Sequence, residues 1–504
     1  GRHRGTVVSA VPPIVSWLHR HAVDRGGSPA VVAGDETWTW AELDRLASAA
    51  ERRWPSGRPL ALVALPSAAS IAVVHAALRS PLELVVLHPR AADAELQALV
   101  AASGAGLVAT DAASAEALAA MLPVPVTMID ELVSARAMQP DAAAEGPIAD
   151  EAGTIVVPTS GTTGPARLAR LPATSLAASG AAWSSVLPVA TGWLLSLGLA
   201  HVAGLGIAIR AAAAGVPVVV PDSVDAAGIL DAIRSAAADG VAVSHLSLVA
   251  IQLDRILDRM EDDPPPASIR AVLLGGGPIS PALVTRALRA GWPVIPTYGL
   301  TETASGVTAL PTTEASDAPW SAGRPLPDVE LRACDPSDPQ SAPLEPGAIG
   351  ELRVRGPMVF AGYLGDAEAT AAALGADGWL RTGDLGRIDE IGRVEVIDRM
   401  DDLIVAGGEN VAPAEVEAAL AEHPDVADVG VVGVPDPTWG RVPVAVIVAR
   451  TGRAVDAQGI QDFARERLAS FKVPKRIVVV DLIPRSPGGK LLRRELAPLV
   501  ESES

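Results

Sequence analysis

Apolar and polar positions alternate along the chain in two periods, which predict strands joined by helices. Short apolar runs at residues 154–157, 271–274 and 293–296 each end in a turn of Gly, Ser or Thr, as buried strands do. Amphipathic stretches of helical period lie at 251–260 and 281–290. This alternation predicts an α/β fold with a largely parallel sheet, whose ligands bind beyond the carboxyl ends of the strands. We therefore expect the three turns to face one crevice.

The chain is long enough for two domains. Its 504 residues exceed the size of one ordinary core. The charged run at 398–402 predicts the boundary, with a large domain over residues 1–400 and a small one over residues 401–504. The small domain opens with an apolar run, a Gly407-Gly408 turn and a helix that Pro413 begins.

Composition excludes several classes of protein. The net charge of -19 disfavours nucleic acid as a partner, so a polyanionic ligand needs a local cluster of cations. The single cysteine, Cys334, excludes a disulfide framework and a four-cysteine metal site. The longest apolar stretch, residues 194–220, contains His201 and Arg210, which indicates a buried helix and strand rather than membrane insertion. No basic-then-apolar signal segment opens the sequence, and we expect a cytoplasmic monomer or homodimer.

A loop rich in hydroxyls and glycines follows the first apolar run. Its side-chain and backbone donors can wrap phosphate oxygens, although such turns also occur without a ligand. The loop comprises Thr159, Ser160, Gly161, Thr162, Thr163 and Gly164. It resembles the phosphate-gripping loop of the adenylate-forming acyl-CoA synthetase superfamily.

A second segment, residues 297–302, follows another strand-like run. By its residues alone it predicts a helix start, with Thr301 as the cap and Glu302 complementing the helix dipole. It also resembles the superfamily's Tyr-Gly-x-Thr-Glu segment, in an AMP site that includes Thr297 and Gly299. The resemblance implies that Tyr298 packs on adenine, Thr301 binds the α-phosphate and Glu302 helps to hold Mg²⁺, a cation that prefers oxygen ligands.

Further segments match the superfamily in the same order along the chain. Gly275, Gly276 and Gly277 resemble the glycine-rich strand end that lines the adenine and acyl pockets. Asp384 stands where an aspartate accepts hydrogen bonds from the ribose, and Arg399 where an arginine contacts ribose or phosphate. The resemblance makes Asp401 the hinge of a mobile lid. Asp398 replaces the usual glycine, a departure without an interpretation from sequence.

Lys490 is one of three lysines in the chain, beside Lys472 and Lys475. From its position near the end of the sequence alone, Lys490 would be interpreted as a solvent-exposed lysine without a catalytic role. Its Pro-Gly-Gly-Lys loop resembles the superfamily's catalytic-lysine loop, in which the ammonium bridges the substrate carboxylate and the α-phosphate. After lid rotation, the face carrying Gly407 and Gly408 replaces the lysine and borders the CoA channel.

The sequence departs from the superfamily directly after the phosphate loop. Arg167 stands at the usual lysine position and Leu168 at the usual glycine position. An arginine fork does not simply replace a lysine point charge, and losing one preorganised donor typically costs on the order of 10²–10³ in rate. We therefore hypothesise weakened adenylation from ATP, with intact transfer of the acyl group from an adenylate to a thiol.

His201, Val202 and Gly206 resemble the segment that borders the acyl pocket. No aspartate that could pair with an α-ammonium group occurs there, which argues against an amino acid. Small neighbours predict a roomy pocket for a bulky aryl or polycyclic acid, and the segment is most similar to the o-succinylbenzoate-CoA ligase branch. The loop departures leave the acyl group unassigned, and His201 is equally consistent with a core histidine.

Together the matches imply an acyl-CoA ligase. Its expected ligands are a carboxylic acid, ATP or an acyl-adenylate, coenzyme A and Mg²⁺. Its expected fold is a large α/β domain with a distorted barrel, followed by a small mobile α+β lid. Two alternatives stay open: an enzyme that loads a carrier protein, and a nucleotide-binding pseudoenzyme. An upstream adenylating enzyme is the expected partner if the chain lacks its own adenylation.

Overall fold

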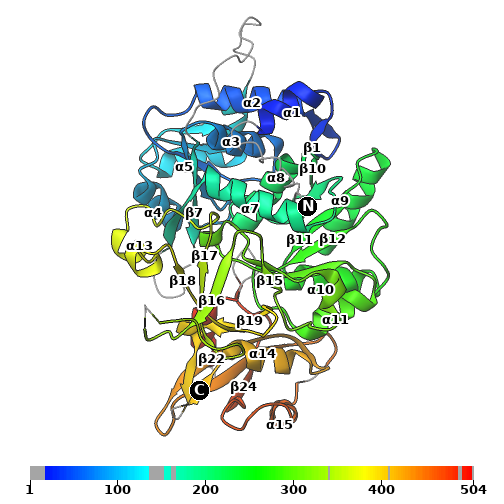
Figure 1. The fold of residues 1–504 in the computed structure, drawn as a ribbon, viewed down its shortest axis with the longest axis vertical. Helices are drawn as coiled ribbons and strands as arrows, with labels where there is room; N and C mark the ends of the chain where they lie inside the picture. The colour runs from blue at the N-terminus through cyan, green and yellow to red at the C-terminus, as the bar shows by residue number, and fades with distance from the viewer. Residues whose placement is uncertain are drawn as a thin grey trace, which may run out of the picture.

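The structure, a computed structural model, describes residues 17–134, 152–159, 166–338, 341–406, 409–453, 455–485 and 491–501. These residues form four sheets. Three belong to a large N-terminal part and one to a small C-terminal part, drawn in orange and red at the bottom of Figure 1. Among the helices in these ranges, none is long and apolar enough to cross a bilayer.

The first sheet has six strands in the order β6-β5-β3-β4-β7-β8. Its strands are β3 (Leu60–Val63), β4 (Glu83–Leu87), β5 (Leu107–Thr110), β6 (Val126–Met128), β7 (Thr154–Thr159) and β8 (Arg167–Pro172). Neighbours run parallel except β7 and β8, which pair antiparallel. Its helices are α3 (Ala68–Arg79), α4 (Asp93–Ser103), α5 (Ala112–Met121) and α6 (Ile129–Val133).

The second sheet has nine strands in the order β15-β14-β13-β12-β11-β9-β10-β1-β2. They are β1 (Pro29–Ala33), β2 (Glu36–Thr39), β9 (Trp193–Leu194), β10 (Val218–Val220), β11 (His245–Leu248), β12 (Ala271–Leu274), β13 (Val294–Tyr298), β14 (Thr308–Ala309) and β15 (Arg324–Pro325). The run from β1 to β13 is parallel, and β2, β14 and β15 add antiparallel edges. The helices around it are α1 (Trp17–Arg25), α2 (Trp40–Arg52), α7 (Ala173–Val186), α8 (Val202–Ala214), α9 (Ala226–Ala238), α10 (Ala250–Arg259), α11 (Pro281–Arg289) and the short α12 (Thr312–Ala315).

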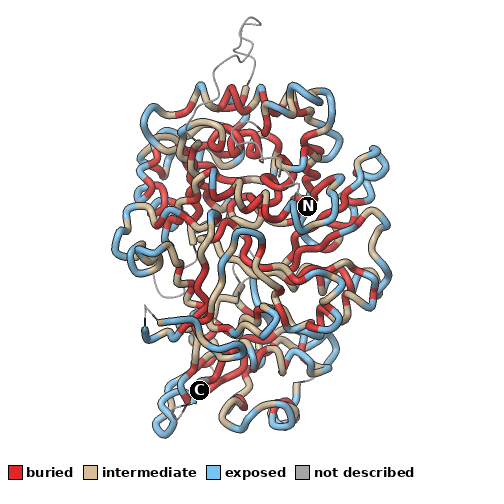
Figure 2. Tube along the Cα trace, viewed as in Figure 1, coloured by how far each residue is buried: buried red, intermediate tan, exposed pale blue. Residues whose placement is uncertain are grey.

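Helices cover both faces of the two sheets and form a layer between them. In β12, Leu273 belongs to the hydrophobic cluster that includes α7 and α8, whereas Leu274 belongs to the cluster of α9, α10 and α11. In β4, Val86 joins the first of these clusters, whereas Leu87 packs with α4 and α5. Both faces of these strands are therefore buried, which explains why they are apolar without interruption. Figure 2 shows the buried residues concentrated in this layered part.

The predicted α/β class is confirmed, and most predicted elements lie within two residues of those observed. Strand β12 covers the predicted 271–274, and α10 and α11 match the two amphipathic stretches. The Ser280 hydroxyl caps α11 by accepting a hydrogen bond from the Leu283 N–H at 3.1 Å. The expectation of one sheet was wrong, because β7 lies in the six-stranded sheet, whereas β12 and β13 lie in the nine-stranded one.

A third sheet stands between these layers and the C-terminal part. Its antiparallel strands are β16 (Glu330–Cys334), β17 (Gly350–Arg355), β18 (Leu380–Ile388) and β19 (Val394–Arg399), with α13 (Ala367–Ala373) before β18. A bridge between Gly323 and Val394 joins it to the end of the nine-stranded sheet. This sheet is the part of the fold that we expected as a distorted barrel.

The C-terminal part has its own core. Its strands are β20 (Ile404–Ala406), β21 (Glu409–Val411), β22 (Val426–Asp436), β23 (Gly440–Ala449) and β24 (Arg476–Val479), with helices α14 (Pro413–Ala421), α15 (Ala457–Arg465) and α16 (Leu496–Glu501). Its two hydrophobic clusters contain no described residue before Ile404. A small α+β unit thus follows the large part, and its boundary at residue 400 stays a prediction.

Candidate active site

Strands β13, β18 and β19 bring together an aspartate, a tyrosine and an arginine. The Tyr298 hydroxyl donates a hydrogen bond to Asp384 Oδ2 at 2.7 Å. The Arg399 Nε lies 2.8 Å from Asp384 Oδ1, across the register in which Asp384 and Arg399 are paired. The side chain of Asp384 is only 8% exposed, so its charge depends on these partners. Three residues predicted to bind AMP therefore meet at one point.

The electrostatics of this group follow from burial and from the carboxylate. Burial first, and then the facing Asp384 charge, raise the pKa of Tyr298 well above its ordinary value, so the phenol remains a donor. Burial has the largest single effect on Arg399 and disfavours its cation, but the attractions of Asp384, Tyr298, Glu302 and Asp402 together outweigh burial and raise the pKa of the guanidinium. The Asp384 carboxylate therefore lies between a hydroxyl donor and a guanidinium donor.

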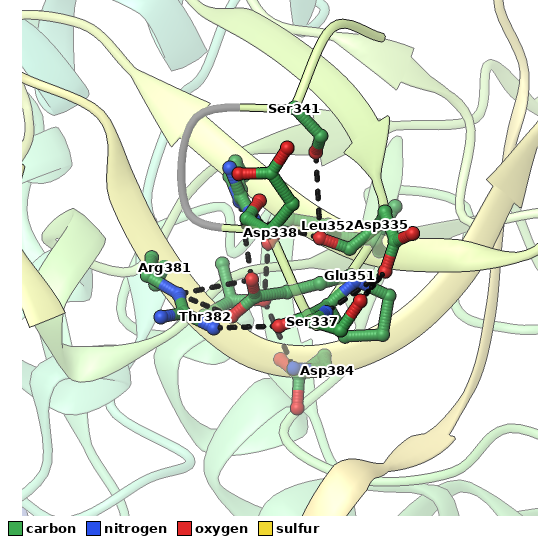
Figure 3. Close-up of polar contacts among 11 residues, drawn as sticks. Asp335, Ser337, Asp338, Ser341, Glu351, Leu352, Arg381, Thr382 and Asp384 are labelled. Atoms are coloured by element: carbon green, nitrogen blue, oxygen red, sulfur yellow. Dashed lines mark hydrogen bonds and ion pairs between the residues drawn. The ribbon is translucent and has the colours of Figure 1, made fainter. Parts of the chain in front are cut away.

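A buried ionic network behind Asp384 holds β18 in place. Glu351 Oε2 accepts hydrogen bonds from the Nε atoms of Arg353 and Arg381, at 3.1 and 3.0 Å. The Thr382 hydroxyl donates to the Leu352 carbonyl at 2.6 Å and accepts from the Asp384 N–H at 3.0 Å. Figure 3 shows these contacts beside the loop that begins at Asp335. Sequence analysis did not find this network.

Glu302 lies in the turn η3 (Thr301–Thr303), directly after β13. Its Oε1 accepts a hydrogen bond from the Tyr363 hydroxyl at 2.7 Å, and its carbonyl accepts from the Phe360 N–H at 2.9 Å. The prediction that Thr301 caps a helix was wrong: the turn is a single 3₁₀ turn, and the Thr303 hydroxyl accepts from the Leu300 N–H at 2.9 Å.

The β7–β8 hairpin ends beside Glu302 and Tyr363. The Thr159 hydroxyl donates to the Arg167 carbonyl at 3.2 Å. The Arg167 guanidinium lies 5.5 Å from the centre of the Tyr363 ring, with Nε 3.8 Å from Asp366 Oδ2. Leu168, which replaces the usual glycine of the superfamily, is a residue of β8, and its side chain is buried in the core beside the six-stranded sheet.

Several predicted site residues lie outside the described residues. They are Ser160, Gly161, Thr162, Thr163, Gly164, Gly407, Gly408 and Lys490. Their roles stay predictions, as does the role of Asp401, which is exposed in the turn η4 (Met400–Asp402).

The glycines after β12 adjoin Thr297 at the end of β13. A Cβ atom on Gly275 would lie 2.4 Å from the Thr297 hydroxyl, so the close approach of the two strands requires glycine. That hydroxyl donates to the Leu274 carbonyl at 3.0 Å. Gly276 has a φ of +79°, which also favours glycine. Gly277 has open space around it. Because β12 and β13 are parallel, these residues share the carboxyl edge of the sheet with Tyr298.

His201 precedes α8 and faces a second histidine that sequence analysis missed. The rings of His201 and His88 are 5.3 Å apart, and the buried Nε2 of His201 has no hydrogen-bond partner among the described residues. Burial, with a smaller contribution from Arg90, lowers the pKa of His201, so its ring is neutral at physiological pH.

A crevice too narrow to admit a water molecule lies between α7, α8 and the residue that follows η3. Its lining residues are Leu176, Ser179, Gly180, Gly206, Ile209, Arg210 and Ala304. The roomy acyl pocket stays a prediction. A Cβ atom on Gly206 would lie 2.8 Å from the Arg210 Nη1. The Arg210 guanidinium therefore occupies the space that a side chain at position 206 would take.

Arg210 is a buried cation without an anion. The residue is 3% exposed, and its guanidinium lies 4.8 and 5.7 Å from the rings of Trp193 and Trp183. Nη2 donates to the Ser247 hydroxyl at 3.2 Å, whereas Nε has no partner, and the described residues place no carboxylate in ion-pair contact with it. Burial lowers the pKa of Arg210 to about 9, so the group is still charged at pH 7. The sequence signal was present, since this arginine interrupts an apolar run.

Asp398, the unexplained departure, links the large part to the C-terminal part. Its two carboxylate oxygens accept hydrogen bonds from the N–H groups of Arg399 and Ala414, each at 2.8 Å. Ala414 is in the first turn of α14, so Asp398 caps this helix from outside its own segment. Nearby, Arg493 pairs with the buried Glu417 and with Asp402.

Comparison with known proteins gives consistent matches over nearly the whole chain. The family model described as AMP-binding enzyme matches residues 18–364, and the model of the AMP-binding enzyme C-terminal domain matches residues 415–490. The chain is 36% identical over 498 residues to the 2-succinylbenzoate–CoA ligase of Geobacillus kaustophilus, covering 96% of this chain and 98% of that protein.

Solved structures agree. The o-succinylbenzoate CoA synthetase of Bacillus subtilis, in complex with its acyl-adenylate intermediate, superposes with a TM-score of 0.84 at 32% identity, over 95% of this chain and 97% of the other. An amide bond synthetase from Marinactinospora thermotolerans gives the same TM-score at 28% identity, over 97% and 100% of the two chains.

Proposed function

The chain belongs to the AMP-binding enzymes, in their acyl-CoA ligase branch, and from this premise we propose that it converts an aromatic dicarboxylic acid of the 2-succinylbenzoate type into a CoA thioester. In such a ligase the acid attacks the α-phosphate of ATP and gives acyl-AMP and pyrophosphate. The thiol of CoA then attacks the acyl carbon, forms the thioester and releases AMP.

The single observation that carries the dicarboxylate is Arg210. A buried guanidinium without an anionic partner is costly, and a carboxylate that binds in a planar, bidentate manner is the ligand that best offsets the cost. An acid with two carboxyl groups keeps one ionised after the other has been activated. The crevice at Arg210 also touches Ala304, two residues after Glu302, so a carboxylate bound there would lie close to the nucleotide site. Its binding requires the lining side chains to move apart, because the crevice does not admit a water molecule.

The nucleotide half of the site fits AMP by its chemistry. We assign the ribose to Asp384, supported by Arg399, and adenine to Tyr298 and the glycines that follow β12. Thr301 and the loop after Thr159 are our candidates for the phosphates. These assignments carry over from the family motifs and are proposals for this chain.

Glu302 fits a magnesium ion. One of its oxygens accepts the Tyr363 hydrogen bond, and the other, Oε2, makes no hydrogen bond or ion pair among the described residues, although the Arg399 charge attracts the carboxylate. A carboxylate oxygen together with nucleotide phosphates is a usual ligand set for Mg²⁺, which neutralises phosphate charge when bound. Related structures contain ATP and a magnesium ion.

We retain the hypothesis that adenylation is the weaker half-reaction. The cation at the usual lysine position, Arg167, is occupied by Tyr363 and Asp366, which supports a reduced contact with phosphate. Leu168 does not support it, because its side chain lies in the core.

The test is the product formed from 2-succinylbenzoate, ATP, Mg²⁺ and CoA, identified by mass spectrometry. We expect AMP and a CoA thioester, and little product from two analogues that each lack one carboxyl group. The preformed adenylate with CoA is tested in parallel, and equal turnover from both starting points would refute weakened adenylation. If the enzyme forms an amide from added amines, the acyl acceptor is an amine and not CoA. If it transfers the acyl group only to a carrier protein, the acceptor is the thiol of that protein. No product from the adenylate would favour a pseudoenzyme.

A further inference from the structure

Tyr363 is one of two tyrosines in the chain, and the function proposed above does not use it. Its hydroxyl lies 2.7 Å from Glu302 Oε1, although the two residues are 61 positions apart in the sequence. Phenol-to-carboxylate hydrogen bonds are charge-assisted and stronger than neutral ones. The contact therefore restrains the rotamer of Glu302.

The backbone around Tyr363 is itself fixed against β8. The Ala361 N–H donates to the Arg170 carbonyl at 2.9 Å, and the Leu364 N–H donates to the Leu168 carbonyl at 2.8 Å. The Tyr363 N–H donates to the Thr370 hydroxyl at 2.9 Å. Residues 361–364 thus lie along β8 as a short extra strand, so Tyr363 is held by the return strand of the phosphate-loop hairpin.

Two side chains also contact the ring. Phe360 packs edge-on at 4.9 Å, and the Arg167 guanidinium lies 5.5 Å from the ring centre. Phe360 also donates its N–H to the Glu302 carbonyl, so the same segment contacts Glu302 at both its backbone and its side chain. A ring held on several sides keeps its hydroxyl at a fixed point.

We propose that Tyr363 is a positioning residue for the adenylation half-reaction: it occupies one oxygen of Glu302 and directs the other toward the divalent cation of the nucleotide. The proposal rests on the proposed function, since it assumes that Glu302 serves a magnesium nucleotide. Arg167, over the same ring, begins β8, so the start of this strand and Glu302 both contact Tyr363.

The chain offers a matched pair of variants for the test. Tyr363→Phe and Tyr298→Phe each remove one hydroxyl that lies 2.7 Å from a carboxylate, and each keeps the ring. Each variant is measured by pyrophosphate release against Mg²⁺ concentration, and by thioester formation from the preformed adenylate. The affinity for ATP is measured by titration calorimetry with and without Mg²⁺, which needs neither acid nor turnover.

For Tyr363→Phe we expect the Mg²⁺ concentration that gives half-maximal rate to rise by roughly 10- to 100-fold, the loss expected for a hydrogen bond to a charged group. The gain in ATP affinity on adding Mg²⁺ should shrink accordingly, while thioester formation from the adenylate stays within about twofold of the wild type. Tyr298→Phe should weaken ATP binding equally with and without Mg²⁺.

Two results would overturn the proposal. One is a Tyr363→Phe protein with wild-type Mg²⁺ dependence in both measurements. The other is an equal loss in both half-reactions with a lowered melting temperature, which would make the hydroxyl merely structural. If the wild type forms no adenylate, the proposed function fails, and calorimetry alone still decides the role of Tyr363.

Discussion

Replacing Arg210 with methionine should stabilise the free protein and at the same time impair its reaction with a diacid. Burial lowers the pKa of Arg210 to about 9, and at about 1.4 kcal/mol per pKa unit this corresponds to a cost of roughly 5 kcal/mol at neutral pH. The two tryptophan contacts offset part of it, at about 0.5–2 kcal/mol each, and the Ser247 hydrogen bond offsets about 1 kcal/mol. We therefore expect Arg210→Met to raise the free energy of unfolding by about 0–3 kcal/mol, in the same direction as other buried ionic groups replaced by apolar ones.

The effect on activity should have the opposite sign. Leaving a buried carboxylate without its cation costs about 2–5 kcal/mol, so kcat/KM for 2-succinylbenzoate should fall by roughly 30- to several thousand-fold. A monocarboxylate analogue has no second charge to lose, and its already low kcat/KM should change by less than about threefold. Arg210→Lys keeps the positive charge but lacks the planar guanidinium group. Its kcat/KM for 2-succinylbenzoate should therefore lie between the values of the wild type and the methionine variant.

Two measurements decide this prediction. Urea unfolding of the free protein gives the change in stability, and initial rates with each acid give the change in kcat/KM. Equal losses for the diacid and the monocarboxylate would refute the assignment of Arg210 to the second carboxylate. A destabilised methionine variant would refute the reasoning about burial.

Three further predictions concern other parts of the molecule. Asp384→Asn should weaken the binding of AMP by about 1.5–3 kcal/mol, because a neutral amide replaces a carboxylate acceptor. Titration calorimetry with AMP measures this affinity, and an unchanged affinity would refute the assignment of the ribose to Asp384. Asp398→Ala should lower the stability of the C-terminal part by about 1 kcal/mol through loss of the α14 cap, seen as faster hydrogen exchange at Ala414 against an unchanged rate in α10. Finally, His75 and His245 are buried, and burial lowers the pKa of each to about 4. The unfolded state then binds more protons than the native state between about pH 6.5 and pH 4, so stability should fall as the pH falls through this window, and His75→Asn should flatten the fall. A pH-independent free energy of unfolding there would contradict it.

The elements of the fold were predictable from the sequence because their signals are local. The uninterrupted apolar run Ala271–Leu274 is buried on both faces, and the adjacent residues Ser280 and Pro281 are a typical sequence signal for the start of α11. The residues of the candidate AMP site were predictable only as motifs, since the contact of Tyr298 with Asp384 joins positions 86 residues apart. Local chemistry also misled, because a threonine that begins a turn does not reveal whether Thr301 or Thr303 will accept the capping hydrogen bond.

The residues that sequence reasoning missed share a physical cause. Arg210 was visible as a polar break, but its surroundings come from Trp183, Trp193 and Ser247 on separate elements, so its lack of an anion is a property of the tertiary structure. Asp398 looked anomalous because its partner, the α14 backbone, lies in the C-terminal part. Tyr363 carries no periodic or motif signal, and only its distance to Glu302 gives it a role.

We propose that the site activates one carboxylate of a diacid as an acyl-adenylate before the thioester forms. The decisive experiment uses 2-succinylbenzoate labelled with ¹⁸O in both carboxyl groups, together with ATP, Mg²⁺ and CoA. The mass of the nucleotide product is then measured by mass spectrometry. Attack of the carboxylate on the α-phosphate, followed by attack of the thiol on the acyl carbon, leaves one labelled oxygen on the phosphate. We expect AMP carrying a single ¹⁸O in equal amount to the thioester. Unlabelled AMP, or ADP in its place, would contradict the account.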